Sequence, residues 1–420
     1  MLPLKKHLAQ AGARPQVEAL TQAEAARDFP RPVRLTPATS GYLDAIRALA
    51  ALAVMFGHCR GLYFVDYGHI EPGNATSFVK AIYAITGFGH QAVMVFFVLS
   101  GLFISSSILR NHGKQTWSWR DYVIDRGTRL YIVLIPGLLL GLVWDFVGIK
   151  FFNSSGIYSA PIASFGDHVP IQTLTSATFI GNALFLQTRF TPVFGSNGPL
   201  WSLFNEFWYY ILFPAVIATI IAARRRAIRV TLGYLLLVAF TIWLLGSQLL
   251  GFVVWLAGCG VALTSRHLRF TDSPRWLAAL YTLCAGGLSC VCLSAARAGN
   301  SWLGSDLSVG ISFALLTHGV LQVQIPIGES VLKLANTFAG FSYSLYVLHF
   351  PLLLLIRAKW LPTFRWQPDL VHLTYGLCIG LFALLYAFAV ARITERKTSA
   401  VRAWVRSRIA GEASWSRGNP

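Results

Sequence analysis

The chain has 420 residues, of which 55% are hydrophobic and only 12% are charged, whereas a soluble domain carries roughly a quarter charged residues. Residues 81–109 contain no Asp, Glu, Lys or Arg, and a helix needs about 20 such residues to cross a bilayer. Composition therefore excludes a single soluble domain and predicts an all-α protein embedded in the lipid bilayer. The formal charge of +18 does not indicate a nucleic-acid partner, because the basic residues stand at the ends of apolar segments.

The chain divides into three parts by composition. Residues 1–40 are polar and rich in Ala, Arg and Pro, and they lack the apolar run of about 7–15 residues that a secretory signal needs. We interpret them as a cytoplasmic tail. Residues 41–392 form the predicted transmembrane domain, and residues 393–420 form a basic tail that we also place in the cytoplasm.

Hydropathy predicts ten transmembrane helices, at residues 42–63, 84–109, 130–149, 199–223, 229–246, 248–264, 276–296, 306–323, 339–357 and 371–391. A further apolar stretch at 174–187 is short and is interrupted by Thr, Ser, Gly and Asn. If it crossed the membrane, the arginine cluster at 224–229 would lie outside, against the preference of Lys and Arg for the cytoplasmic side. We therefore expect 150–197 to be one excursion on the outer side, with 174–187 interfacial or re-entrant and both termini cytoplasmic.

The first predicted span carries Asp44, Arg47 and His58 in an otherwise apolar helix. Each of these residues costs at least about a few kcal/mol at mid-membrane depth. Helical geometry places Arg47 and His58 on one face and about 16 Å apart, and Asp44 can pair with Arg47 one turn later. The alternative is that Asp44 and Arg47 are interfacial anchors, while His58 hydrogen-bonds a neighbouring helix.

Two later spans carry further polar side chains. Glu206 lies in the fourth span, and Ser342, Tyr346 and His349 lie with Tyr343 in the ninth. We expect these helices to converge with the first span. Hydrogen bonds between packed helices are an alternative explanation for the cluster in the ninth span, because Ser and Tyr commonly bridge transmembrane helices.

Several motifs in this chain stand in an order that is typical of one protein family. The stretch from Leu43-Asp44-Ala-Ile-Arg47 to His58 resembles the opening R-x10-H motif of the acyltransferase-3 family of integral membrane O-acyltransferases. The later matches are Phe96-Phe97-Val-Leu-Ser100-Gly101, Arg126-x-x-Arg129, Trp201-Ser202-Leu203-x-x-Glu206-Phe207-x-Tyr209-Tyr210 and Ser342-x-x-Leu345-Tyr346-x-x-His349-x-Pro351. Each motif alone is weak, but five in the right order make the resemblance strong, and it covers roughly residues 40–392.

The resemblance implies transfer of an acyl group, commonly acetyl, from cytoplasmic acyl-CoA to a hydroxyl of a glycan or lipid-linked sugar. Transfer to an alcohol needs a base, and His is the usual choice because its unperturbed pKa is about 6.5. His58 is therefore the candidate general base. Arg126 and Arg129, expected on a cytoplasmic loop, are candidates for binding the CoA phosphates, since Arg presents forked donors; alternatively, they only anchor the third span.

The remaining roles stay open at this point. Arg47 can bind CoA or polarise the thioester carbonyl, and Glu206 can orient His58 or hold an acceptor hydroxyl. Asp44, Ser342, Tyr346 and His349 complete the set as candidate substrate-binding residues. Acyl transfer can be direct or can pass through an enzyme-bound intermediate. Six cysteines in or beside apolar segments form no CxxC pair and have no His partner at metal spacing, so we expect no metal.

Two other classes of function remain possible for such a chain. A proton-coupled transporter or a flippase for a sugar-containing substrate can use Arg47, His58 and Glu206 as its polar path. A non-catalytic scaffold or sensor gives no reason for a base and an arginine aligned across the membrane. The family favours the bacterial inner membrane as the location, whereas the acceptor, the acyl chain and the oligomeric state stay open.

Overall fold

The computed structural model describes residues 37–162, 167–267, 274–323, 328–361 and 364–415, so most of the predicted N-terminal tail lies outside the described residues. The all-α prediction is confirmed, since the described part contains helices and two isolated bridges but no strand. The helices are α2 (Pro37–Tyr63), α3 (Ser77–Ile85), α4 (Gly89–Gly113), α5 (Trp119–Phe152), α6 (Ser176–Ala183), α7 (Trp201–Arg224), α8 (Ile228–Leu245), α9 (Leu249–His267), α10 (Arg275–Arg297), α11 (Asp306–Val323), α12 (Glu329–Ala339), α13 (Ser342–Trp360), α14 (Leu370–Ile393) and α15 (Thr398–Trp415).

The protein is a multi-pass membrane protein by the length and apolarity of its helices. Within the described residues, eight helical segments qualify as spans, or nine if the bent pair α12 and α13 is one span. The segment 228–265 counts as one of them, although the turn Gly246–Gln248 divides it into α8 and α9. The predicted count of ten is therefore not confirmed. The stretch at 174–187 contains the eight-residue helix α6, which is too short to cross a bilayer.

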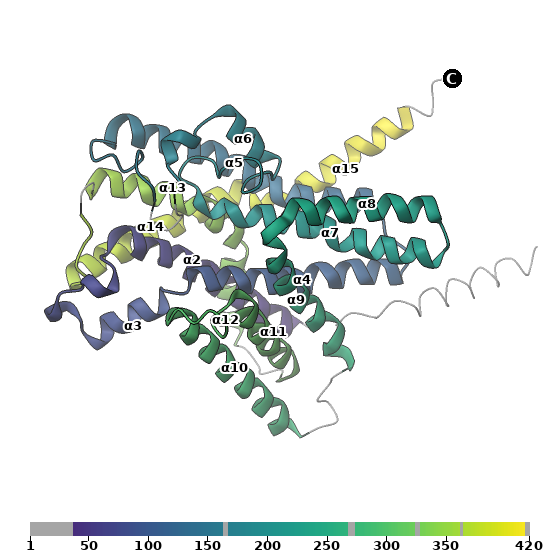
Figure 1. The fold of residues 1–420 in the computed structure, drawn as a ribbon, viewed down its shortest axis with the longest axis horizontal. Helices are drawn as coiled ribbons and strands as arrows, with labels where there is room; N and C mark the ends of the chain where they lie inside the picture. The colour runs from purple at the N-terminus through teal and green to yellow at the C-terminus, as the bar shows by residue number, and fades with distance from the viewer. Residues whose placement is uncertain (1–36, 163–166, 268–273, 324–327, 362–363, 416–420) are drawn as a thin grey trace, which may run out of the picture.

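Helix α4 runs through the middle of the bundle and packs against α2, α7, α9 and α11 (Figure 1). It approaches α9 closely at two glycines, where an added Cβ at Gly101 would meet the Trp255 carbonyl and one at Gly258 would meet the Val98 carbonyl. Small residues of this kind let the backbones of membrane helices come into contact. The α4 and α9 backbones therefore lie in contact at these two glycines.

Helix α13 lies between α2, α5 and α14, and most of its side chains are buried. The chain bends by 55° between α12 and α13, so the predicted span at 339–357 begins at this bend. Helix α5 is longer than its predicted span, because its polar first turns from Trp119 onward are helical as well. The burial of α13 makes it the element against which the polar residues of its neighbours pack.

The segment between α5 and α7 folds back onto the bundle. Asp145 of α5 is buried and accepts hydrogen bonds from the backbone N–H and the hydroxyl of Ser196, both at 2.6 Å. The amide of Asn197 donates to the carbonyl of Val347 in α13 at 2.9 Å. These contacts fix the start of α7 against α5 and α13.

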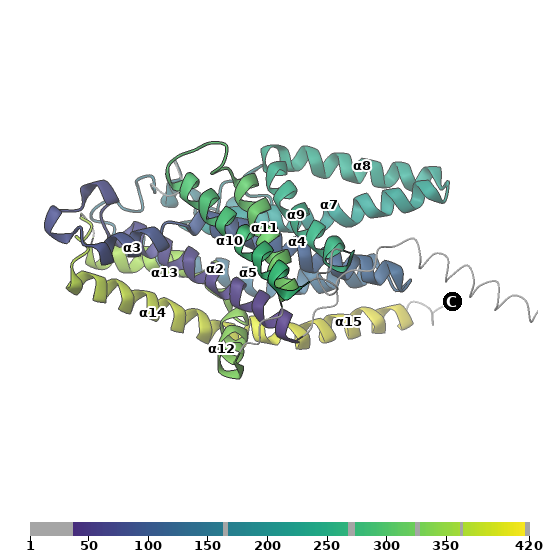
Figure 2. The same ribbon diagram turned by 90° about the horizontal axis from the view of Figure 1, so that it is seen from below.

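The C-terminal helix α15 projects away from the bundle in Figure 1 and roughly continues the line of α14 in Figure 2. Ion pairs join it to the first turns of α5: Arg402 to Asp125 at 3.2 Å, and Arg406 to Asp125 at 2.9 Å. Part of the predicted basic tail is thus a helix that contacts α5.

Candidate active site

A pocket of about 280 Å³ lies between α2, α4, α5, α7 and α13. Its polar lining residues are Arg47, Ser100, Arg126, Arg129, Ser202, Glu206, Tyr210, Ser342, Tyr343 and Tyr346. Apolar side chains, such as Phe96 and Phe103, complete the wall. The five motifs found in the sequence thus all contribute to the lining of one pocket.

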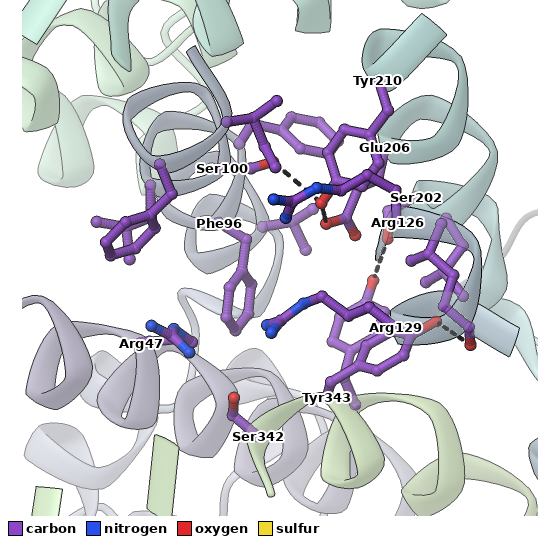
Figure 3. A pocket seen from close by; sticks show the side chains of 18 residues that line it. Arg47, Phe96, Ser100, Arg126, Arg129, Ser202, Glu206, Tyr210, Ser342 and Tyr343 are labelled. Atoms are coloured by element: carbon purple, nitrogen blue, oxygen red, sulfur yellow. Dashed lines mark hydrogen bonds between the residues drawn. The ribbon is translucent and has the colours of Figure 1, made fainter. Parts of the chain in front are cut away.

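Three arginines from two helices extend into this pocket, and Figure 3 shows the guanidinium groups of Arg47 and Arg129 pointing toward one another. Arg47 forms the predicted ion pair with Asp44, at 2.7 Å, while Asp44 itself does not line the pocket. Arg126 and Arg129 lie three residues apart, so they share one face of α5. The structure corrects their expected position, because α5 begins at Trp119 and both arginines are helical instead of lying on a loop.

Glu206 supplies the carboxylate of the pocket. The Tyr210 hydroxyl, one turn later on α7, donates to this carboxylate, and the Ser100 hydroxyl lies 3.4 Å from the Tyr210 oxygen. The indole N–H of Trp255 donates to the Ser100 hydroxyl oxygen at 3.1 Å. A hydrogen-bonded chain therefore runs from Trp255 of α9 through Ser100 of α4 to Tyr210 and Glu206 of α7, and Figure 3 shows its part from Ser100 to Glu206.

His58 lies against His349, with 2.8 Å between Nδ1 of His58 and Nε2 of His349. The two rings are stacked, with centroids 5.1 Å apart. Nδ1 of His349 lies 2.8 Å from the Leu345 carbonyl oxygen, which can only accept, so this nitrogen carries the proton. In the neutral pair Nε2 of His349 then accepts from Nδ1 of His58, which leaves the lone pair of His58 on its Nε2.

The histidine pair does not line the arginine pocket. Tyr346 stands between the two, since its ring contacts Phe96 of the pocket at 6.0 Å between centroids and His349 at 6.4 Å. Its hydroxyl is held by the Ser202 hydroxyl, at 2.7 Å. Glu206 lines the pocket with Tyr210, while His58 contacts His349. Whether Glu206 orients His58 or holds an acceptor hydroxyl stays a prediction.

The cluster of the ninth predicted span serves packing as well as the pocket. The Ser342 hydroxyl donates to the Ala339 carbonyl at 2.9 Å, and the Tyr343 hydroxyl donates to the Leu130 carbonyl at 3.3 Å. Both residues still line the pocket. Ser342 and Tyr343 therefore both hydrogen-bond neighbouring backbone carbonyls and line the pocket.

Sequence reasoning did not select Glu395, which lies just after α14. Its carboxylate accepts from the backbone N–H of Ser344 at 2.9 Å and from the Ser344 hydroxyl at 2.8 Å. Its negative charge also acts on Arg47 and Arg129. The only signal in the sequence is an acidic residue directly before the basic pair Arg396 and Lys397, and that position was assigned to the C-terminal tail.

Fold and site together define a multi-pass helical membrane protein with a cationic pocket between its helices. The acyltransferase-3 family, described as an acyltransferase domain, matches residues 40–392, and the chain belongs to this family. An O-acetyl transferase of Shigella phage Sf6 is 26% identical over 180 residues, a match that spans 43% of this chain and 46% of the phage protein. No solved structure matches the chain.

Proposed function

We propose that the protein is an O-acyltransferase that moves an acyl group, in the simplest case acetyl, from acyl-CoA to a hydroxyl of a glycan or lipid-linked sugar. Family membership and the similarity to a phage O-acetyl transferase support the reaction class. The observation that carries the proposal is the convergence of Arg47, Arg126 and Arg129 on one pocket. Guanidinium groups make strong charge-assisted hydrogen bonds to phosphate oxygens, and the phosphates of CoA are such partners.

The roles of the three arginines follow from their positions. Arg126 and Arg129 come from the early turns of α5 and bind CoA phosphates, since planar guanidinium groups match phosphate oxygens in pairs. Arg47 faces them from α2 and interacts with the pantetheine arm or the thioester carbonyl. The buried Nε of Arg126 has no hydrogen-bond partner among the described residues, so it can donate to a bound anion.

His58 acts as the general base in this proposal. Its Nε2 takes the proton of the acceptor hydroxyl while the alcohol oxygen bonds the acyl carbon. The thioester C–S bond then breaks, and the proton returns to the sulfur to give free CoA thiol. Because Tyr346 lines the pocket and its ring contacts His349, the acyl end of the donor has to pass this ring to reach His58.

The test is binding and turnover of radiolabelled acetyl-CoA by the purified protein, with a hydroxyl acceptor present. We expect Arg126→Ala/Arg129→Ala to lose binding, and His58→Ala to keep binding but lose turnover by about 100-fold or more. Arg189→Ala, which removes an exposed cation that does not line the pocket, is the matched control and keeps both. Wild-type protein that neither binds nor consumes acyl-CoA contradicts the proposal and favours a transporter.

A further inference from the structure

A second cavity, an apolar groove of about 380 Å³, lies between the C-terminal end of α2, helix α3 and the first turns of α14. Its lining is apolar apart from a few residues, and it includes Phe56, Phe64, Ile82, Leu373 and Leu377. It shares no lining residue with the arginine pocket. The groove therefore requires an explanation separate from acyl transfer.

The rim of this groove faces the surroundings of the bundle with large apolar side chains. Phe78 is 64% exposed and Leu370 is 76% exposed. Because α2 and α14 are membrane-spanning helices, such side chains belong in lipid instead of water. The groove thus opens sideways to the bilayer, and an apolar chain from the membrane can enter it without crossing a polar layer.

One cation lines the groove, the guanidinium of Arg60 in the last turn of α2. It lies over the Tyr83 ring, 5.0 Å from the centroid, and its buried Nε finds no hydrogen-bond partner among the described residues. The nearby anion Asp66 is engaged by Arg365 at 2.6 Å. Arg60 is therefore a partly buried cation that lines an apolar groove, which is a favourable arrangement for an anionic group at its mouth.

We propose that this groove binds a membrane lipid with a phosphate in its headgroup, with one apolar chain along α3 and α14 and the phosphate at Arg60. A guanidinium beside an apolar cavity complements such a molecule at both ends. Arg60 and His58 are two residues apart, or about 200° around α2, so the bound lipid does not contact His58. The proposal is thus independent of the acyl transfer proposed above.

The test is native mass spectrometry of the purified protein titrated with phosphatidylglycerol, or with diacylglycerol of the same chains. Two variants address the two ends of the site: Arg60→Gln removes the charge, and Thr374→Trp fills the groove, which Thr374 lines. Matched controls are Arg189→Gln and Phe382→Trp, because both residues are exposed and neither lines the groove. Thermal melting confirms that each variant is folded.

We expect one phosphatidylglycerol bound to the wild type, at least about tenfold weaker binding in both test variants, and control affinities within about twofold of the wild type. Equal binding by Thr374→Trp and wild type overturns the groove. Equal affinity for diacylglycerol and phosphatidylglycerol overturns the phosphate contact. Displacement of the lipid by inorganic phosphate alone also overturns the proposal, since it would show a free-phosphate site. If Arg60→Gln does not fold, the comparison of Thr374→Trp with the wild type still tests whether the lipid occupies the groove.

Discussion

At the scale of single residues, the Leu345 carbonyl determines which ring nitrogen of His58 carries the proton, although it contacts only His349. The Leu345 carbonyl fixes the proton on Nδ1 of His349, and His349 in turn fixes the proton on Nδ1 of His58. Such an arrangement selects the tautomer that a general base needs. His349 is therefore a positioning residue in the proposed reaction.

This relation predicts different effects for two substitutions of His349. Gln can accept from Nδ1 of His58 through its side-chain oxygen, whereas Leu cannot. We expect His349→Leu to lower kcat for acetyl transfer by about 100-fold and His349→Gln to lower it by about tenfold or less. KM for acetyl-CoA stays unchanged in both, because the arginine pocket is not altered. Equal losses in the two variants, or a shift in KM, would show that His349 acts in another way.

The loop after α2 contains Asp66, whose carboxylate pairs with Arg365 in the segment between α13 and α14. Both guanidinium N–H groups of Arg365 donate to the carboxylate of Asp66, at 3.0 and 2.6 Å, and these hydrogen bonds lower the pKa of Asp66. The folded state thus prefers the ionised carboxylate. Its stabilisation is complete above the ordinary Asp pKa of about 3.9 and is lost as the pH falls through the lower folded pKa.

We therefore predict that the thermal midpoint of the wild type falls more than that of Asp66→Asn between about pH 5 and pH 3. The difference corresponds to less than about 1 kcal/mol, since the Asp66 side chain is 60% exposed to solvent. Glu71→Gln, which changes an exposed carboxylate of the same loop, serves as control and follows the wild type. Parallel curves for Asp66→Asn and the wild type would assign the acid sensitivity to other groups.

At the scale of elements, the close approach of α4 and α9 depends on Gly101 in α4 and Gly258 in α9. An added side chain at Gly258 meets the backbone carbonyl of Val98, whereas Gly260 on the same helix faces open space. Backbone atoms cannot move aside as a flexible side chain can, so the helices have to separate. Ser100 of α4 and Trp255 of α9, which lead to Glu206, would separate with them.

Gly258→Leu should therefore destabilise the protein by about 1–3 kcal/mol or more, while Gly260→Leu should be nearly neutral. Thermal unfolding of the two variants in the same detergent measures this contrast. The proposed site is expected to suffer as well, with weaker acetyl-CoA binding in Gly258→Leu alone. If both variants unfold at the wild-type temperature, α4 and α9 do not pack through this glycine.

The elements also show which parts of the fold hydropathy can predict. Long apolar runs locate the helices that face lipid, because lipid exposure leaves a composition signal. The first turns of α5 are polar and give no such signal, although they carry Arg126 and Arg129. Hydropathy also gives no signal for the bend between α12 and α13. The helix Glu329–Ala339 is amphipathic, so its mean hydropathy does not distinguish it from a loop.

The site could be predicted as a set of residues but not as an arrangement. Buried polar residues in apolar spans are costly and therefore stand out, which is why Arg47, His58, Glu206 and His349 were all selected from the sequence. Their grouping depends on how each helix is rotated about its own axis, and that is decided by packing. Consequently the placement of Glu206 with Tyr210, and of His58 with His349, needed the structure.

At the scale of the whole molecule, the loops alternate between the two ends of the bundle. The loop 64–76 precedes α4, and the loop 114–118 follows its single crossing, so the two lie at opposite ends. Counting on across α5 and α7, 225–227 lies with 114–118. The segment 298–305 lies with 64–76, because Arg297 and Asp306 at its two ends contact Tyr83 and His90, which precede or begin α4. The arginines at 224–226 and Lys114 are concentrated at the end that holds 114–118 and 225–227. The positive-inside tendency predicts that this end lies in the cytoplasm.

Cysteine labelling tests this orientation, with a membrane-impermeant maleimide applied to intact bacterial cells. We expect Gly73→Cys and Asn300→Cys to be labelled directly, and Thr116→Cys and Ala227→Cys to be labelled only after permeabilisation. The unmodified chain is the background control, because its six cysteines are buried or lie in apolar helices. The proposed reaction requires this result, since acyl-CoA is made in the cytoplasm and Arg126 and Arg129 lie in the early turns of α5, directly after 114–118. Labelling of Thr116→Cys in intact cells would place the arginine pocket toward the outside and would leave it without its proposed donor.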